Sequence, residues 1–193
     1  MKTLSLSSLN KVFKKSEPNF SEFTEFSCLK NEVFSYQIAF KPETSEETHI
    51  EVFVDSELYG NIKLFIVRNI PAGKTTNENA DSFHYDLTLK EYPDMLEPVE
   101  GKFTAKKGEW SSLWVEYSPT DGICGKKNIS VTLSAGETKV TNTFKLEILD
   151  NELPKQELLY TNWFHNDCLC TYYGVEVFSE EYWEMVEHYI KNA

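Results

Sequence analysis

The sequence predicts a mainly β protein, an immunoglobulin-like antiparallel β-sandwich that is followed by a short strand, a loop and a helix. Three observations support this fold class. Apolar residues alternate with polar ones in several short stretches, turn-forming residues separate these stretches, and no helical periodicity interrupts them before Asp150. We expect about seven to nine strands in this part of the chain, a number typical of sandwiches.

The first half of the chain contains the clearest strand patterns. Residues 3–6 alternate weakly and predict an edge strand, and Pro18 and its polar neighbours predict a loop. Residues 33–40 place Phe34, Tyr36, Ile38 and Phe40 on one face. Residues 49–54 and 62–67 follow with similar patterns. Because these three strands have short polar connections, we expect them to form a β-meander.

The second half returns to strand patterns after a long connection. Residues 71–100 lose periodicity, and we expect an ordered excursion that is held by the apolar residues Phe83, Tyr85, Leu87, Leu89 and Tyr92. Residues 110–117 predict a strand, and Asp121 and Gly122 predict a turn. Residues 129–133 and 140–148 predict a hairpin that turns at Ala135 and Gly136.

The organisation changes near Asp150. We expect a β-sandwich over residues 1–150, a linker over 151–155 and a second part over 156–193. In this second part, residues 156–162 predict a short strand. Ser179 is a suitable N-cap, and Trp183, Val186 and Ile190 form the apolar stripe of an amphipathic helix. The order of strand, loop and helix resembles the opening unit of an α/β domain.

Composition and charge exclude several classes of function. The formal net charge is −12, and we see no stripe of Lys and Arg, so we expect no nucleic acid partner. No apolar run has the length of a signal peptide or a membrane helix, which predicts a cytoplasmic protein without membrane contact. Four cysteines without paired CxxC spacing predict buried free thiols rather than a metal site, and we expect no cofactor.

The candidate site lies at residues 161–173, which gather aromatic and titratable side chains. His165 and Asp167 are suited to hydrogen bonds with sugar hydroxyls, and Trp163, Tyr172 or Tyr173 to stacking on a sugar ring. The structural alternative is that His165 and Asp167 satisfy each other or nearby backbone groups. Because Cys168 and Cys170 are two apart, we expect them on opposite faces of a strand, which argues against joint metal ligation.

Two tryptophans form a weaker candidate. Trp110 and Trp114 are four apart on a predicted strand and therefore share one face. They form either an exposed platform for carbohydrate or part of the core between the two sheets, and core packing is the simpler interpretation.

Three stretches together resemble glycoside hydrolase family 123 and the related domain of unknown function 4091. The most specific is "TNWFHNDCLCTYYGVEVFSEEYWEMVEHYI", which looks like the start of the family's catalytic barrel. The stretch "EYPDMLEP" is similar to a Tyr-Pro-Asp-x-Leu-x-Pro loop of its N-terminal domain, and "SLWVEYSPTDGICGKKNISVTL" to a strand, turn and strand there.

The resemblance implies an N-terminal β-sandwich followed by a (β/α)8 barrel that cleaves β-linked N-acetylgalactosaminides. The implied mechanism is substrate-assisted: the 2-acetamido oxygen attacks the anomeric carbon, an Asp orients that amide, and a neighbouring Glu protonates the leaving oxygen. The resemblance places this Asp-Glu pair beyond Ala193, so we expect no catalytic residue in this chain and only the first unit of a barrel.

Three functional hypotheses follow. The chain is the non-catalytic accessory sandwich of a family 123-like protein, a free-standing module that binds carbohydrate or protein, or a fragment that regains function with a separately encoded barrel. The expected partners are accordingly the missing barrel, in cis or in trans, and a glycan, and a homodimer is a further expectation if Trp183, Val186 and Ile190 are left unburied.

Overall fold

The computed structural model describes residues 1–43, 46–71, 91–119, 122–155, 157–159, 161 and 165–192, without the side chain of Tyr59. The chain divides into two compact units, Met1–Pro154 and Lys155–Ala193. The predicted excursion residues Phe83, Tyr85, Leu87 and Leu89 lie outside the described residues.

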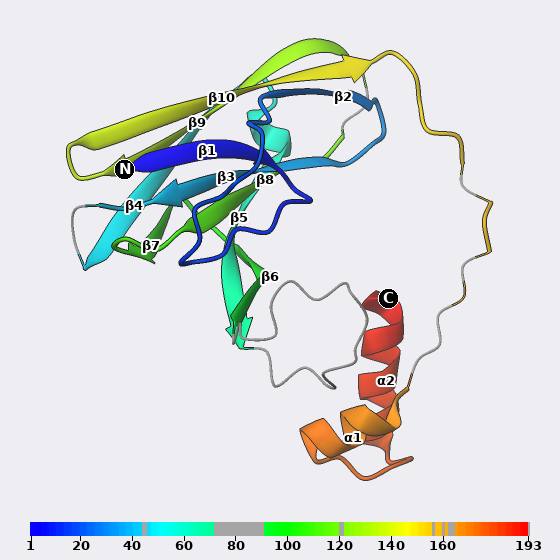
Figure 1. Ribbon diagram of the computed structural model, residues 1–193. Helices are drawn as coiled ribbons and strands as arrows, with labels where there is room; N and C mark the ends of the chain where they lie inside the picture. Colours follow the sequence, from blue (N-terminus) through cyan, green and yellow to red (C-terminus); the bar gives the residue numbers. More distant parts are fainter. Residues whose placement is uncertain are drawn as a thin grey trace. The chain divides into compact units, whose positions relative to one another are not determined.

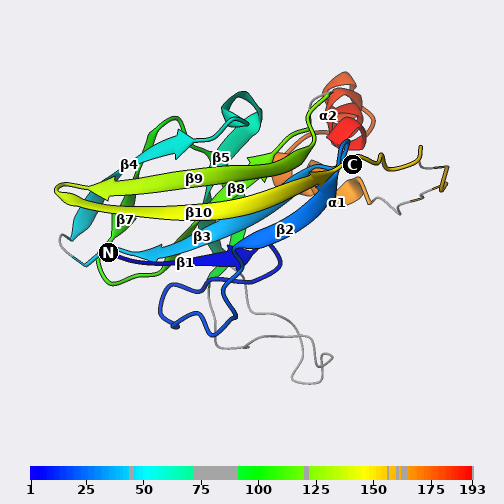
Figure 2. The ribbon, with the colours of Figure 1, turned by 90° about the horizontal axis from the view of Figure 1, so that it is seen from above.

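The first unit is a β-sandwich, which confirms the predicted fold class (Figure 1). One sheet has the order β1-β3-β8-β5-β6, with β1 (Lys2–Ser7), β3 (Phe34–Lys41), β8 (Ser111–Tyr117), β5 (Ile62–Pro71) and β6 (Glu91–Pro98). The other has the order β2-β10-β9-β4-β7, with β2 (Glu25–Leu29), β10 (Thr138–Leu149), β9 (Gly125–Ala135), β4 (Glu47–Asp55) and β7 (Lys102–Lys106). We call them the first and the second sheet; Figure 2 shows β1 and β3 beneath β9 and β10.

Neighbouring strands are antiparallel except β2, which runs parallel to β10. The weak strand at residues 3–6 is indeed an edge strand, since β1 pairs only with β3. The predicted hairpin is confirmed, because β9 and β10 pair from Ala135 and Thr138 onwards.

The predicted β-meander is wrong. The strands β3 and β5 both pair with β8 in the first sheet, whereas β4 lies in the second sheet between β9 and β7. Period-two alternation shows which face of a strand is buried but not which strand is its neighbour, so consecutive strands can cross between the sheets. A short 3-10 turn at Tyr59–Asn61 precedes one such crossing into β5.

Two further predictions are wrong. Residues 91–98 form β6 rather than a loop, and this strand pairs with β5. No strand forms at the described residues 157–159 and 161 of the predicted C-terminal strand. The backbone groups of β6 have a partner in β5. Residues 157–159 and 161 have no strand to pair with in the described part of their unit.

The main core lies between the sheets. Phe34, Tyr36, Ile38 and Phe40 of β3 are all buried, as their alternation predicts, and the ring of Tyr36 stacks on Phe144 of β10 at 4.2 Å. Such pairs add about 0.5–1.5 kcal/mol to the burial of area. A second small cluster, Leu6, Val12, Ala39 and Trp110, covers the outer face of the first sheet.

Within the described part of the chain, no helix is both long and apolar enough to cross a membrane.

Candidate functional site

The second unit consists of two helices, α1 (Asp167–Tyr173) and α2 (Glu180–Asn192). Gly174 ends α1 in the left-handed conformation with φ 68°, which a side chain would strain. Ser179 is the N-cap of α2 as predicted, because its Oγ accepts a hydrogen bond from the backbone N–H of Tyr182 at 3.2 Å. Helix formation from Asp167 means that the predicted loop and the strand position of Cys168 and Cys170 are wrong.

The core of this unit is small. Among the described residues it consists of Cys170, Tyr182 and Val186, with Val175 and Met185 packed against it. The Tyr182 hydroxyl accepts a hydrogen bond of 2.9 Å from the Asn166 amide, which joins the two helices. Within the part of this unit that the structure describes, three buried side chains are far fewer than the core of a stable domain contains.

His165 and Asp167 are both exposed. The described structure contains no hydrogen bond between their side chains, so the expectation that they satisfy each other is wrong. Their backbone carbonyls do accept hydrogen bonds. The His165 carbonyl accepts one from the Cys168 thiol at 3.0 Å, and the Asp167 carbonyl accepts one from the Thr171 hydroxyl at 3.5 Å. Among the residues described, neither side chain has a hydrogen-bond or ion-pair partner, and contact with a sugar stays a prediction. Trp163 lies outside the described residues.

The structure brings the predicted tyrosines together. Tyr172 and Tyr173 contact each other edge to face with ring centroids 4.9 Å apart, and Tyr172 is 82% exposed. The Tyr173 and Tyr189 hydroxyls are 2.6 Å apart. This hydrogen bond raises the pKa of Tyr189. We call Tyr172, Tyr173 and Tyr189 the tyrosine cluster; it offers ring faces and hydroxyls at the surface of the unit.

The predicted apolar stripe of α2 is only partly buried. Val186 is buried, but Trp183 and Ile190 are 50% and 61% exposed. Phe178, which precedes the helix, has a φ of 67° although it is not glycine, and its ring stacks on Trp183 at 5.9 Å. An exposed aromatic in this strained conformation is unusual and adds to an uncovered apolar surface.

Sequence reasoning missed Asn166, Tyr182 and Tyr189. The signal was present, because Tyr182, Val186 and Tyr189 are spaced at i, i+4 and i+7, the repeat of one helix face. The choice of Trp183 and Ile190 for the stripe selected a neighbouring face that the unit leaves exposed.

The two tryptophans share the outer face of the first sheet, not the core between the sheets. Trp110 is only 4% exposed, which excludes it as a platform, and its Nε1 donates to Glu17 at 3.2 Å. The Lys41 ammonium lies 5.8 Å from the centre of its ring. Trp114 is half-buried and lies between Gln37 of β3 and Phe65 of β5. Core packing between the sheets is therefore the wrong interpretation for both, since both lie on the outer face, where Trp110 belongs to the small cluster.

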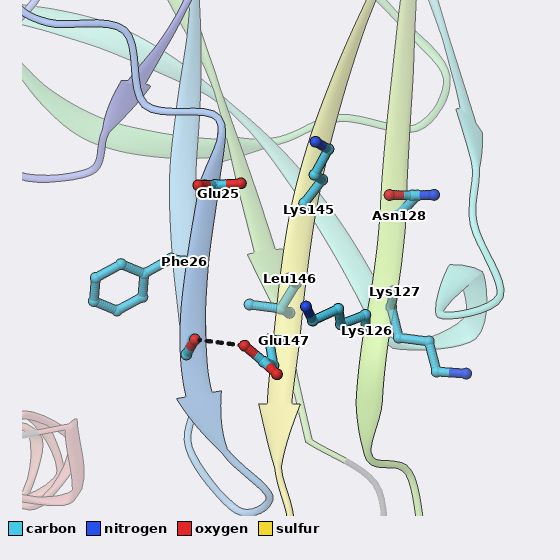
Figure 3. A pocket seen from close by; sticks show the side chains of 9 residues that line it. Glu25, Phe26, Lys126, Lys127, Asn128, Lys145, Leu146 and Glu147 are labelled. Carbon is cyan, nitrogen blue, oxygen red and sulfur yellow. Dashed lines mark hydrogen bonds between the residues drawn. The ribbon is translucent and has the colours of Figure 1, made fainter.

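A hollow of about 710 Å³ lies over β2, β10 and β9 of the second sheet (Figure 3). Lys126 and Lys145 alternate with Glu25 and Glu147, and Phe26 points away from them. Glu147 accepts a hydrogen bond from Ser27 at 3.3 Å. Alternating charges of both signs are typical of a solvated sheet face, so this hollow provides no specific chemistry.

Among the described residues, no group of three or more His, Cys, Asp or Glu is placed to hold a metal ion. The four cysteines are free, and only two of them are buried as predicted, Cys28 and Cys170, whereas Cys124 and Cys168 are exposed.

Comparison with known proteins finds a structural likeness that covers nearly the whole chain. No family model and no curated protein matches the sequence. A family 123 glycoside hydrolase from Clostridium perfringens, studied for glycolipid glycan hydrolysis, matches 99% of this chain with a TM-score of 0.71 and 17% identity. This chain covers 36% of that enzyme, so it spans about a third of its length. At this identity the likeness shows a shared fold.

Two other solved structures are much less similar. The CooA pilin subunit from enterotoxigenic Escherichia coli matches 78% of this chain and 99% of its own, with a TM-score of 0.38 and 7% identity. The N-terminal domain of PorA matches 78% of this chain and 100% of its own, with a TM-score of 0.33 and 8% identity.

Proposed function

We propose that this chain is the non-catalytic N-terminal part of a family 123-like glycoside hydrolase, an accessory β-sandwich joined to the first unit of a catalytic barrel. The observation that carries the proposal is the match of 99% of this chain to 36% of a family 123 enzyme. The match includes the second unit, which a free-standing sandwich does not need. The parent activity is cleavage of β-linked N-acetylgalactosaminides, and the catalytic Asp-Glu pair lies in the barrel that follows.

The second unit supports the proposal by what it leaves uncovered. Trp183, Ile190 and Phe178 are all at least half exposed, and the buried core beneath them has three side chains. Large apolar side chains exposed together mark a surface that packs against a partner. The partner in this proposal is the rest of the barrel, in cis or in trans. A strand at residues 156–162 would form only with neighbouring barrel strands to bond with.

In a complete barrel, the residues of this chain that would contact the substrate are His165, Asp167 and the tyrosine cluster. Barrel enzymes build their sites from the connections between each strand and the helix that follows it, and His165, Asp167 and helix α1 lie between the predicted strand and α2. His165 and Asp167 provide hydrogen bonds to hydroxyls, and Tyr172 and Tyr173 provide ring faces. Trp163 belongs to the same stretch.

The test is hydrolysis of an aryl β-N-acetylgalactosaminide by the purified chain. We expect no release of the aryl group above the uncatalysed rate, because the proposal places the catalytic pair in the barrel and not in this chain. A complete family 123 enzyme assayed alongside provides the positive control. Turnover by the 193-residue chain would contradict the proposal.

A free-standing carbohydrate- or protein-binding module is the second candidate. The sandwich is a self-contained unit with its own core, which favours this alternative. It predicts that the sandwich alone, residues 1–154, binds a glycan or protein as tightly as the full chain does. The accessory-domain proposal instead predicts that residues 155–193 change binding or activity once a barrel is supplied.

A further inference from the structure

We propose that the turn between β2 and β3 is a clamp that holds the chain in one fixed direction as it leaves the sandwich. The turn consists of residues 29–32, and we call residues 150–153, which follow β10, the exit segment. Both belong to the first unit. The inference goes beyond the proposed function and does not depend on it, because it concerns bonds within the sandwich.

The turn is closed by its own hydrogen bonds. The backbone N–H of Glu32 donates to the Leu29 carbonyl at 3.1 Å, which is the bond between the first and fourth residues of a β-turn. The Glu32 carboxylate in return accepts a hydrogen bond from the Leu29 backbone N–H at 3.0 Å. Lys30 and Asn31 are therefore the two central residues. Because β2 lies in the second sheet and β3 in the first, the turn is anchored in both sheets.

The exit segment first continues the parallel pairing of β10 with β2. The last pair of the two strands is Leu149 with Leu29. One further backbone bond follows, in which the Lys30 N–H donates to the Asn151 carbonyl at 3.0 Å. The chain of β2 then turns away towards β3, and among the described residues its backbone pairing with the exit segment ends there.

The side chain of Asn31 takes the place of the backbone partner. Its Nδ2 donates to the Leu153 carbonyl at 3.0 Å, and its Oδ1 accepts a hydrogen bond from the Leu153 backbone N–H at 2.7 Å. A residue of an antiparallel strand exchanges the same two bonds with its partner. Only Asn and Gln carry a side-chain amide with this donor and acceptor, so both bonds depend on the residue type at position 31.

Two other features restrict the exit segment. Pro154 follows Leu153 directly, and a proline restricts the residue before it to extended conformations. The Lys30 ammonium forms an ion pair with the Asp150 carboxylate. The Asp150 side chain is 74% exposed, and exposed ion pairs contribute little to stability. We therefore expect the Asn31 amide, rather than this ion pair, to hold the segment.

A fixed exit segment limits where the following part of the chain can go. The distance that a flexible linker spans grows with the square root of its number of residues. Residues that are bonded to the sandwich do not contribute to this freedom. The clamp thus removes residues 150–153 from the flexible connection and sets the direction in which the chain continues.

The experiment measures backbone order in the full ¹⁵N-labelled chain by NMR relaxation. We expect order parameters of Asn151 and Leu153 that match the value of a rigid backbone, about 0.85. Asn31→Ala removes both amide bonds, and we expect these order parameters to fall below about 0.6, while those of β10 stay unchanged. In this variant the Leu153 amide should also exchange with solvent at least about tenfold faster.

Two matched variants separate the amide from other causes. Asn128→Ala removes an exposed asparagine side chain that makes no hydrogen bond among the described residues, and it should leave the exit segment ordered. Lys30→Gln removes the ion pair with Asp150 but keeps the backbone N–H that bonds Asn151, and it should also leave the segment ordered.

Two results would overturn the inference. One is low order of the exit segment in the unchanged chain, which would mean that the bonds to Asn31 are transient. The other is an ordered exit segment in a folded Asn31→Ala variant, with folding checked by its thermal unfolding. Neither result affects the aryl glycoside assay, so failure of the clamp and failure of the proposed function are distinguishable.

Discussion

The thiols of Cys28 and Cys124 lie in opposite surroundings. Cys28 lies in the main core, whereas Cys124 is exposed. Burial, with a smaller contribution from the charge of Glu32, raises the pKa of Cys28 from 9.0 to about 11. Sequence reasoning predicted buried thiols for all four cysteines and was right for two, because single cysteines carry no periodicity that reports their burial.

The raised pKa predicts slow alkylation of Cys28. The thiolate is the reactive form, so we expect iodoacetamide at pH 8 to label Cys28 about a hundredfold more slowly than Cys124. Peptide mass spectrometry over a time course measures both rates in one sample. Labelling in denaturant, where both thiols are exposed, is the control and should equalise them. Equal rates in the folded protein would contradict the burial of Cys28.

The same shift has a consequence for stability. Because the neutral thiol is favoured in the folded state, the contribution of Cys28 to stability is complete below its ordinary pKa of 9.0 and is lost as the pH rises towards about 11.

Among the elements, those with one strongly apolar face were predictable. The alternation of Phe34, Tyr36, Ile38 and Phe40 identifies β3, and Gly136 identifies the hairpin between β9 and β10. The partner of each strand was not predictable, because alternation carries no information about the neighbour. The strand β6 was missed since Pro93 and Pro98 read as loop residues, and this strand lies at the edge of its sheet, where proline is tolerated.

The hairpin glycine provides a test at the scale of the element. Gly136 has a φ of 59°, while Gly60 in the 3-10 turn shows no left-handed φ, and neither has a neighbour within 4 Å of an added Cβ. We expect Gly136→Ala to lower the free energy of unfolding by about 1 kcal/mol through backbone strain alone. Gly60→Ala is the matched control and should change it little. Chemical denaturation measures both, and equal effects would argue against strain at the turn.

The exposed face of α2 predicts self-association of the chain. With Trp183 and Ile190 half exposed or more, we expect reversible dimers or larger species in sedimentation velocity at high concentration. The double variant Trp183→Ser, Ile190→Ser should sediment as a monomer. Phe53→Ser is the control, because Phe53 is 66% exposed on the sandwich. A native chain that remains monomeric at all concentrations would show that this face needs no partner.

At the scale of the whole molecule, the sequence was sufficient to predict the sandwich but not the arrangement of the candidate site. The sandwich could be predicted because its core is formed by local patterns repeated along the chain. The site could not, because the arrangement of His165, Asp167 and the tyrosines depends on helix α1, and apolar periodicity in a segment of seven residues is too short to identify a helix. The cluster around Trp110 depends on contacts between distant parts of the chain, which only the structure provides.

The central proposal is that the second unit is the beginning of a larger domain and is not stable by itself. Hydrogen exchange of the backbone amides in the full chain tests it most directly, because a helix of thirteen residues with few packed side chains is marginal in water. We predict that amides of α2 exchange at least about a hundredfold faster than those of β3 and β10. Protection of α2 equal to that of the sandwich strands would contradict the claim.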